Sequence, residues 1–143
     1  MAKKVKVFVD SNVWFSAFYK KGVASRLLEK LANKKYEVVI SQLVLEEVAI
    51  NIKKKLPSIL PLVHNFFQQY PTVVIKNLSL KALKKHASLA DKKDLPILTS
   101  ALNYKCGYFV TGNIKDFEIG KIKKKCGLKI LNPRKMLTLA GKN

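Results

Sequence analysis

The chain has 143 residues, of which 48% are hydrophobic and 26% are charged, as is typical of a globular protein. No stretch comes near the roughly 18 uninterrupted apolar residues of a membrane span, and two cysteines provide neither a disulfide framework nor a cysteine-based zinc site. We therefore expect a cytoplasmic protein without membrane association, in which Cys106 and Cys126 are both buried thiols.

The charge is strongly unbalanced. Twenty-eight basic residues face nine acidic ones, so the formal net charge is +19, and only Arg26 and Arg134 are arginines. A positive field of this size attracts polyanions. Lysine is a point charge suited to phosphates, whereas arginine is the better reader of base edges. The composition therefore favours binding to a nucleic-acid backbone with little base recognition.

Apolar runs of strand length alternate with helical patterns along the chain. In chain order we expect a strand at 5–9, helices at 12–19 and 24–34, a strand at 38–40, helices at 42–56 and 57–69, a strand at 73–75, helices at 80–89 and 95–105, strands at 108–110 and 129–131, and a helix at 133–140. This alternation predicts an α/β fold, with a mainly parallel central sheet between two layers of helices in a three-layer α/β/α sandwich. The glycines fall at the expected breaks, so residues 1–143 are expected to form a single domain.

Polar side chains follow the ends of several predicted strands. They are Asp10 after the first strand, Glu46 and Glu47 in the helix that Ser41 begins, Asp94 just before another helix, and Thr111, Asn113 and Asp116 after the fourth strand. In open α/β sheets ligands bind at the carboxyl ends of the strands, so we expect these residues to share one rim. The default reading of Asp10 or Asp94 alone would be a helix N-cap. Periodicity does not decide between Glu46 and Glu47, which flank the apolar stripe at similar angles.

The residue types at this rim indicate a hard divalent cation. Carboxylates gathered at one place repel one another unless a cation holds them. Carboxylate, amide and hydroxyl oxygens, without thiol or imidazole, select Mg²⁺ or Mn²⁺. Such an ion lowers the pKa of a bound water and stabilises displacement at phosphorus. The pattern therefore predicts metal-dependent hydrolysis of a phosphodiester.

Four segments of the chain resemble the PIN-domain family of ribonuclease-like proteins, which includes many toxins of toxin–antitoxin pairs. They are Val-Phe-Val-Asp-Ser-Asn-Val at 7–13, Ile-Ser-Gln-Leu-Val-Leu-Glu-Glu-Val at 40–48, Asp-Lys-Lys-Asp-Leu-Pro-Ile-Leu-Thr-Ser-Ala-Leu at 91–102 and Tyr-Phe-Val-Thr-Gly-Asn-Ile-Lys-Asp-Phe at 108–117. Their order and spacing agree with the family over nearly the whole chain.

The resemblance assigns roles to these residues. Asp10, Glu47, Asp94 and Asp116 are the implied catalytic set, in which Asp10, Asp94 and Asp116 hold Mg²⁺ or Mn²⁺; Ser11, Thr111 and Asn113 support them, and Glu46 is the alternative to Glu47. Many family members have an aspartate where this chain has Asn113, and Asp116 three residues later supplies the missing charge. Asp91 is expected to be a solvated turn residue.

The implied activity is that of a metal-dependent endoribonuclease acting on RNA, as the toxin of a toxin–antitoxin pair. The implied partners are an antitoxin protein and a second copy of the chain in a homodimer. The alternative within the family is a catalytically inactive PIN-type RNA-binding module. A phosphoacceptor receiver domain would need a phosphorylatable aspartate after its third strand, and residues 73–77 contain none.

Overall fold

A five-stranded parallel sheet forms the centre of the molecule in the computed structural model, which describes residues 3–32 and 35–141. β1 (Val5–Val9) lies in the middle between β2 (Tyr36–Ser41) and β4 (Tyr108–Val110), and β3 (Val73–Ile75) and β5 (Lys129–Leu131) form the two edges. All four strand pairings are parallel, which confirms the predicted sheet. Each predicted strand is present, and β2 extends beyond the predicted 38–40.

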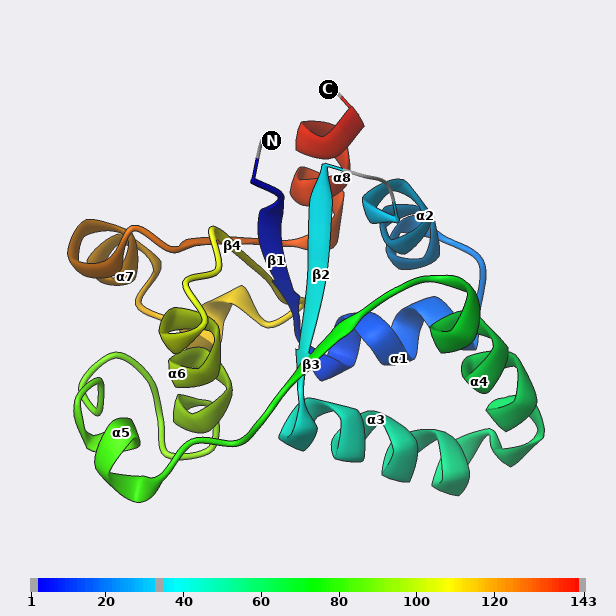
Figure 1. Ribbon diagram of the computed structural model, residues 1–143, viewed down its shortest axis with the longest axis horizontal. Coiled ribbons are helices and arrows are strands. Elements are labelled where there is room, and N and C mark those ends of the chain that lie inside the picture. The colour runs from blue at the N-terminus through cyan, green and yellow to red at the C-terminus, as the bar shows by residue number, and fades with distance from the viewer. Residues whose placement is uncertain (1–2, 33–34, 142–143) are drawn as a thin grey trace.

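Helices cover both faces of this sheet. They are α1 (Ser11–Tyr19), α2 (Val23–Leu31), α3 (Gln42–Lys55), α4 (Leu60–Gln69), α5 (Leu80–Lys84), α6 (Leu95–Asn103), α7 (Ile119–Cys126) and α8 (Pro133–Gly141), with short 3₁₀ turns η1 (Pro57–Ile59) and η2 (Ile114–Asp116). Figure 1 shows α1, α2 and α8 on one side of the sheet, and α6 and α7 on the other. The three-layer α/β/α architecture expected from the sequence is therefore confirmed.

Several predicted helix boundaries are wrong. The segment 57–69 is divided into the 3₁₀ turn η1 and α4, and the segment 80–89 forms only the five-residue α5 followed by turns. The helix predicted at 24–34 ends at Leu31, and its last two positions lie outside the described residues.

Helix α7 was not predicted, because Gly120 was taken as a break and the lysines around it obscure the apolar pattern. Ile122 of α7 is nevertheless fully buried, and Ile119 packs against the same core. The helix ends at Gly127, which adopts the left-handed conformation (φ 74°) and donates its N–H to the Lys123 carbonyl. Left-handed glycine is a common helix C-terminal signal, so Gly127 was the residue from which this helix could have been found.

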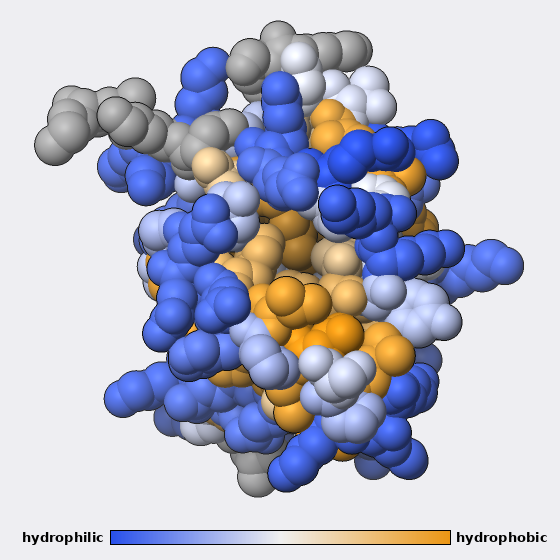
Figure 2. Space-filling view, turned by 90° about the vertical axis from the view of Figure 1, so that its right-hand side faces the viewer, coloured by the Kyte–Doolittle hydropathy of each residue, from blue (hydrophilic) through white to orange (hydrophobic). Residues whose placement is uncertain are grey.

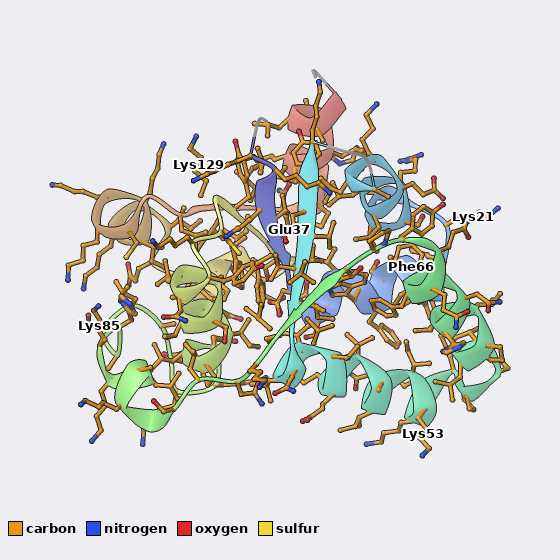
Figure 3. The ribbon with its side chains drawn as sticks, viewed as in Figure 1. Lys21, Glu37, Lys53, Phe66, Lys85 and Lys129 are labelled. Atoms are coloured by element: carbon orange, nitrogen blue, oxygen red, sulfur yellow. The ribbon has the colours of Figure 1, made fainter. Side chains whose placement is uncertain are left out.

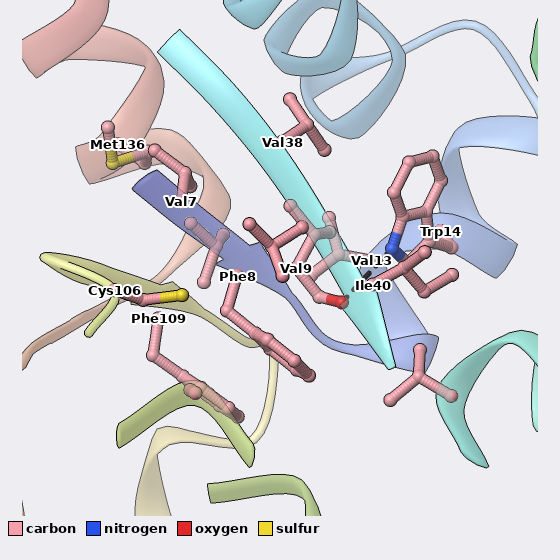
Figure 4. Packing of buried hydrophobic residues seen from close by; sticks show 14 of the residues in the cluster. Val7, Phe8, Val9, Val13, Trp14, Val38, Ile40, Cys106, Phe109 and Met136 are labelled. Carbon is pink, nitrogen blue, oxygen red and sulfur yellow. Dashed lines mark hydrogen bonds between the residues drawn. The ribbon is translucent and has the colours of Figure 1, made fainter. Parts of the chain in front are cut away.

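The core lies on both faces of the central strands (Figure 4). The rings of Phe8 and Phe109 are paired in register and stack with their centroids 5.2 Å apart. Trp14 of α1 is fully buried and donates from Nε1 to the carbonyl of Val9 over 3.0 Å. Each such buried apolar side chain contributes about 1.5–3 kcal/mol to stability, and the Trp14 bond also fixes the first turn of α1 against the end of β1.

The two cysteines differ in environment. Cys106 is buried in the core, as expected, but Cys126 is exposed at the end of α7, so the prediction of two buried thiols is wrong for Cys126. Cys126 belongs to the helix that the sequence reading missed, which explains the error.

No helix in the described part of the chain is long and apolar enough to cross a membrane.

The architecture directs the start of three helices to one edge of the sheet. Figure 1 shows α1 and α3 beginning where β1 and β2 end. Asp10 is the N-cap of α1, Ser41 is the N-cap of α3, and Asp94 is the N-cap of α6. Of the polar residues predicted to share a rim, Asp10 and Asp94 therefore stand at helix starts, and Ser41 begins the helix that carries Glu46 and Glu47.

Candidate active site

Asp10 is the most deeply buried of the predicted acidic residues, with only 6% of its surface exposed. Its Oδ1 accepts a hydrogen bond from the Ser11 N–H at 2.8 Å. Its Oδ2 accepts from Thr111 Oγ1 at 2.9 Å and from Asn12 Nδ2 at 3.2 Å. Burial raises the pKa of this carboxyl above its ordinary value, the hydrogen bonds from Thr111 and Ser11 oppose the rise, and the nearby charge of Glu47 adds to it. The site therefore holds Asp10 in one orientation and favours a cation beside it.

Asn12 ties together two strand ends that are distant in sequence. Its Oδ1 accepts the Gly112 N–H at 2.8 Å, and its Nδ2 lies within hydrogen-bond distance of both Asp10 and Thr111. A Cβ at position 112 would lie 3.1 Å from Asn12 Oδ1, so glycine allows this close approach. The sequence reading did not assign a role to Asn12. Only its place two residues after Asp10 hinted at one.

Helix α3 brings Glu47, and not Glu46, to a cavity that Asp10 also lines. Glu47, Asn51 and Lys55 recur at intervals of four residues on one face of α3 and line the cavity together. Glu46 is exposed and does not line it. Of the two glutamates that the helical periodicity left open, only Glu47 lines the cavity.

Asp94 stands at the N-cap position of α6, but its side chain makes no capping hydrogen bond. Asp94 therefore occupies the cap position without using its side chain as a cap. The carboxyl instead lines the cavity, and its pKa is raised by burial and then by the charges of Asp116 and Asp10, while Lys93 opposes the rise. Asp91 is exposed and lies outside this cavity, as expected of a solvated turn residue.

The loop after β4 supplies the last two predicted residues. The Asn113 N–H donates to Thr111 Oγ1 at 3.1 Å, and the 3₁₀ turn η2 then places Asp116 on the cavity wall. Both residues are exposed. Thr111 is fully buried behind Asp10 and does not reach the cavity, so its role is to hold Asp10 and the loop.

A cavity of about 340 Å³ joins these groups. It is lined by four carboxylates from four elements and by two cations, namely Asp10, Glu47, Asp94, Asp116, Lys55 and Lys93. Among the described residues, no three Asp, Glu, His or Cys side chains lie close enough to hold one ion together. Mg²⁺ commonly binds through only one or two carboxylates and keeps several waters. The oxygen donors thus suit a hydrated hard cation, and they do not form a closed protein cage.

The family of the chain follows from its sequence. Residues 6–115 match the family model described as PIN domain. The chain belongs to the PIN-domain family. No curated protein matches it in sequence. Among solved structures, its fold is similar to that of a chain in the VapBC2 complex from Rickettsia felis bound to a DNA fragment from their promoter, with a TM-score of 0.63 and 23% identity over 90% of this chain and 98% of the other.

The PIN-domain match includes three of the four carboxylates of the cavity. Asp10, Glu47 and Asp94 fall within residues 6–115, and Asp116 lies one position beyond the matched segment. The assignment of Asp116 to the site therefore rests on its position in the structure and not on the family match. It shares a cavity wall with Asp94 and contributes to the raised pKa of that carboxyl.

Proposed function

We propose that this PIN-domain protein is a metal-dependent endoribonuclease that hydrolyses RNA phosphodiester bonds. The observation that carries the proposal is the gathering of four of its nine acidic residues around one small cavity at the carboxyl ends of the strands. In a chain of formal charge +19 such a cluster has no role in solubility. Burial, with a smaller contribution from neighbouring carboxylates, raises the pKa of Asp10 and of Asp94, and such raised values are common at functional sites.

The proposed division of labour follows from position and burial. Asp10, Asp94 and Asp116 would hold a hydrated Mg²⁺ or Mn²⁺, one or two of them directly and the rest through its waters, because the three do not lie close enough to bind one ion together. Such an ion would make its bound water a stronger acid than bulk water and would offset the charge of the reacting phosphate. Glu47, half-buried on α3, would accept a hydrogen bond from the attacking water and take its proton. Thr111 and Asn12 hold Asp10, and Ser11 and Asn113 offer neutral oxygens to water or substrate.

RNA is proposed as substrate because of the charge around the cavity. Lys55 and Lys93 line it directly, and lysines project from helices and turns on several sides of the molecule, as Figure 3 shows for Lys21, Lys53 and Lys85. This field draws in a polyanion without reading its bases. An inactive RNA-binding module is the alternative, and the neutral, exposed Asn113 is the feature that favours it.

A protein partner is proposed from the apolar surface beside α4. Figure 2 shows an apolar area bordered by hydrophilic side chains on the side of the molecule where α4 lies. Helix α4 has no fully buried residue and exposes Leu60 and Leu62. Exposed apolar patches of this kind commonly bind proteins. Since the structural neighbour comes from a complex named VapBC2, we propose an antitoxin as the occupant and a cytoplasmic toxin–antitoxin setting; a homodimer is the other candidate.

Cleavage of labelled RNA separates the nuclease from the inactive module. Structured and single-stranded RNAs are incubated with the protein and Mg²⁺ or Mn²⁺, then with EDTA and with Asp10→Asn. We expect cleavage that requires metal and disappears in Asp10→Asn. Cleavage that persists in the variant would come from a contaminating nuclease, and the assignment of the carboxylates to catalysis would be wrong. Binding without cleavage in either metal would support the inactive module.

A further inference from the structure

A second cavity, of about 560 Å³, lies beside the carboxylate cavity. Its wall comes from the first two turns of α1, the turn that follows α1 and the first half of α2, and it carries three cations, Lys20, Lys21 and Arg26. None of the described residues that line it is acidic. It has no role in the proposed hydrolysis, so its charge requires a separate explanation. We call it the basic cavity.

One side chain stands between the two cavities. Asn12 lines both of them, and its Oδ1 accepts the N–H of Gly112, which lines the basic cavity. Asn113, the next residue, lines the carboxylate cavity. A strand of nucleic acid that places one phosphate at the carboxylates therefore passes over the Asn12–Gly112 hydrogen bond to bring its neighbour to the basic cavity.

The composition of the basic cavity suits a phosphodiester. A guanidinium can donate two parallel hydrogen bonds to phosphate, and two lysines add point charges. Ser16 contributes a hydroxyl to the wall, and Gly22, Val23 and Ala24 add the start of α2, whose partial charge is positive. The volume lies within the usual range for ligand cavities, so it can hold a phosphate with part of its sugar.

We propose that the basic cavity binds a backbone phosphate of the RNA beside the scissile one and so sets the register of the strand across the carboxylates. This inference rests on the proposed ribonuclease function for the identity of the strand. The acidic and the basic side chains would thus serve different phosphates. The carboxylates, with their ion, would act on one phosphate, and Lys20, Lys21 and Arg26 would hold the next.

Binding tests the subsite without cleavage. In the Asp10→Asn background with Mg²⁺, the affinity for an eight-nucleotide single-stranded RNA is compared between Lys20→Gln/Lys21→Gln and the matched pair Lys84→Gln/Lys85→Gln. Lys84 and Lys85 are exposed, and replacing them removes the same charge as replacing Lys20 and Lys21. Figure 3 shows Lys21 and Lys85 on opposite sides of the molecule. We expect a loss of about tenfold or more for the first pair and about twofold or less for the second, with the salt slope reduced by about 0.7 for a lost phosphate contact. Equal losses would overturn the proposal.

A series of RNAs locates the phosphate. Each linkage in turn is replaced by a neutral methylphosphonate, and the 5′ end is tested with and without a phosphate. We expect one internal linkage to carry a large loss of affinity that disappears in Lys20→Gln/Lys21→Gln. A loss confined to the 5′ phosphate, or a loss that persists in the double variant, would overturn the proposal. Because the readout is binding, absence of cleavage in the ribonuclease assay leaves this result interpretable.

Discussion

Thr111 donates a hydrogen bond from Oγ1 to Oδ2 of Asp10 over 2.9 Å, and the two residues are 101 positions apart in the chain. The same Oγ1 accepts the N–H of Asn113, so one buried hydroxyl links the end of β1 to the loop after β4. The parallel pairing of β1 with β4 makes this contact possible, because both strands end at the same edge. The position of Asp10 and the course of the loop therefore depend on each other.

Replacing Thr111 by Val, which has nearly the same shape, removes this link. We expect the free energy of unfolding to fall by about 1–3 kcal/mol, because Asp10 loses a donor and the Asn113 N–H loses its acceptor. Cleavage is expected to fall by about tenfold or more as Asp10 loses its fixed orientation. Denaturant unfolding and RNA cleavage measure the two effects.

Thr138→Val is the matched control. The Thr138 hydroxyl likewise donates one hydrogen bond, but its acceptor is the Arg134 carbonyl and it lies on an exposed face of α8. We expect a stability change of no more than about 0.5 kcal/mol and unchanged cleavage. Similar effects of the two substitutions would contradict the linking role of Thr111.

Glu46 and Glu47 form a neighbouring pair for testing the site. Glu47 lines the carboxylate cavity, whereas Glu46 is exposed outside it. We expect Glu47→Gln to reduce cleavage by about 10²–10⁴-fold, the usual contribution of a positioned general base, and Glu46→Gln to leave it within about twofold. Neither variant should unfold at a lower denaturant concentration than the wild type, since Glu46 is exposed and the charge of Glu47 raises the pKa of Asp10. Equal loss of cleavage from both would show that the assignment to a single glutamate is wrong.

The sequence predicted those parts of the site that depend on element ends. Asp10 directly follows a buried strand and Asp94 directly precedes a helix, so the rule for open α/β sheets placed both at one rim. It could not show that Asp94 leaves its cap position unused, since this depends on the direction of a side chain. Likewise, only the rotation of α3 about its axis shows which of Glu46 and Glu47 faces the cavity.

The role of Asn12 could not be predicted from the sequence for a related reason. Its decisive partner, Gly112, is 100 positions away, and no local pattern encodes that hydrogen bond. Helix α7 was missed because lysines dominate it and Gly120 resembles a break, although Ile122 is buried in the core. Long-range contacts and heavily charged helices are thus where propensity and periodicity carried the least information.

The two thiols should differ sharply in reactivity. Burial raises the pKa of the Cys106 thiol to about 12, so almost no thiolate forms at neutral pH, whereas Cys126 is exposed at the end of α7. A disulfide reagent such as DTNB should therefore modify one thiol rapidly in the native protein and both in denaturant. Cys126→Ser should abolish the rapid reaction and Cys106→Ser should preserve it. Rapid reaction of both native thiols would contradict the burial of Cys106.

Asp94→Asn tests the electrostatic cost of the carboxylate cluster. Because burial and the charges of Asp116 and Asp10 raise the pKa of Asp94 above its ordinary 3.8, the folded protein holds this proton to a higher pH than the unfolded chain does. Stability contributed by Asp94 at low pH is therefore lost as the pH rises from the ordinary Asp range through the folded pKa. In EDTA at pH 7 we expect the variant to be more stable than the wild type, with the difference closing near about pH 3.

Adding Mg²⁺ should reverse this order at pH 7. The cation binds the folded carboxylates and stabilises the wild type, and the variant, with one ligand fewer, should gain less. Asp91→Asn is the control, because Asp91 is exposed and outside the cavity and its charge contributes least to the raised pKa of Asp94; we expect only a small change with or without Mg²⁺. Denaturant unfolding at each pH measures all three proteins. If Asp94→Asn were instead less stable than the wild type at pH 7 in EDTA, the charge of Asp94 would stabilise the start of α6, and the predicted electrostatic cost of the cluster would be wrong.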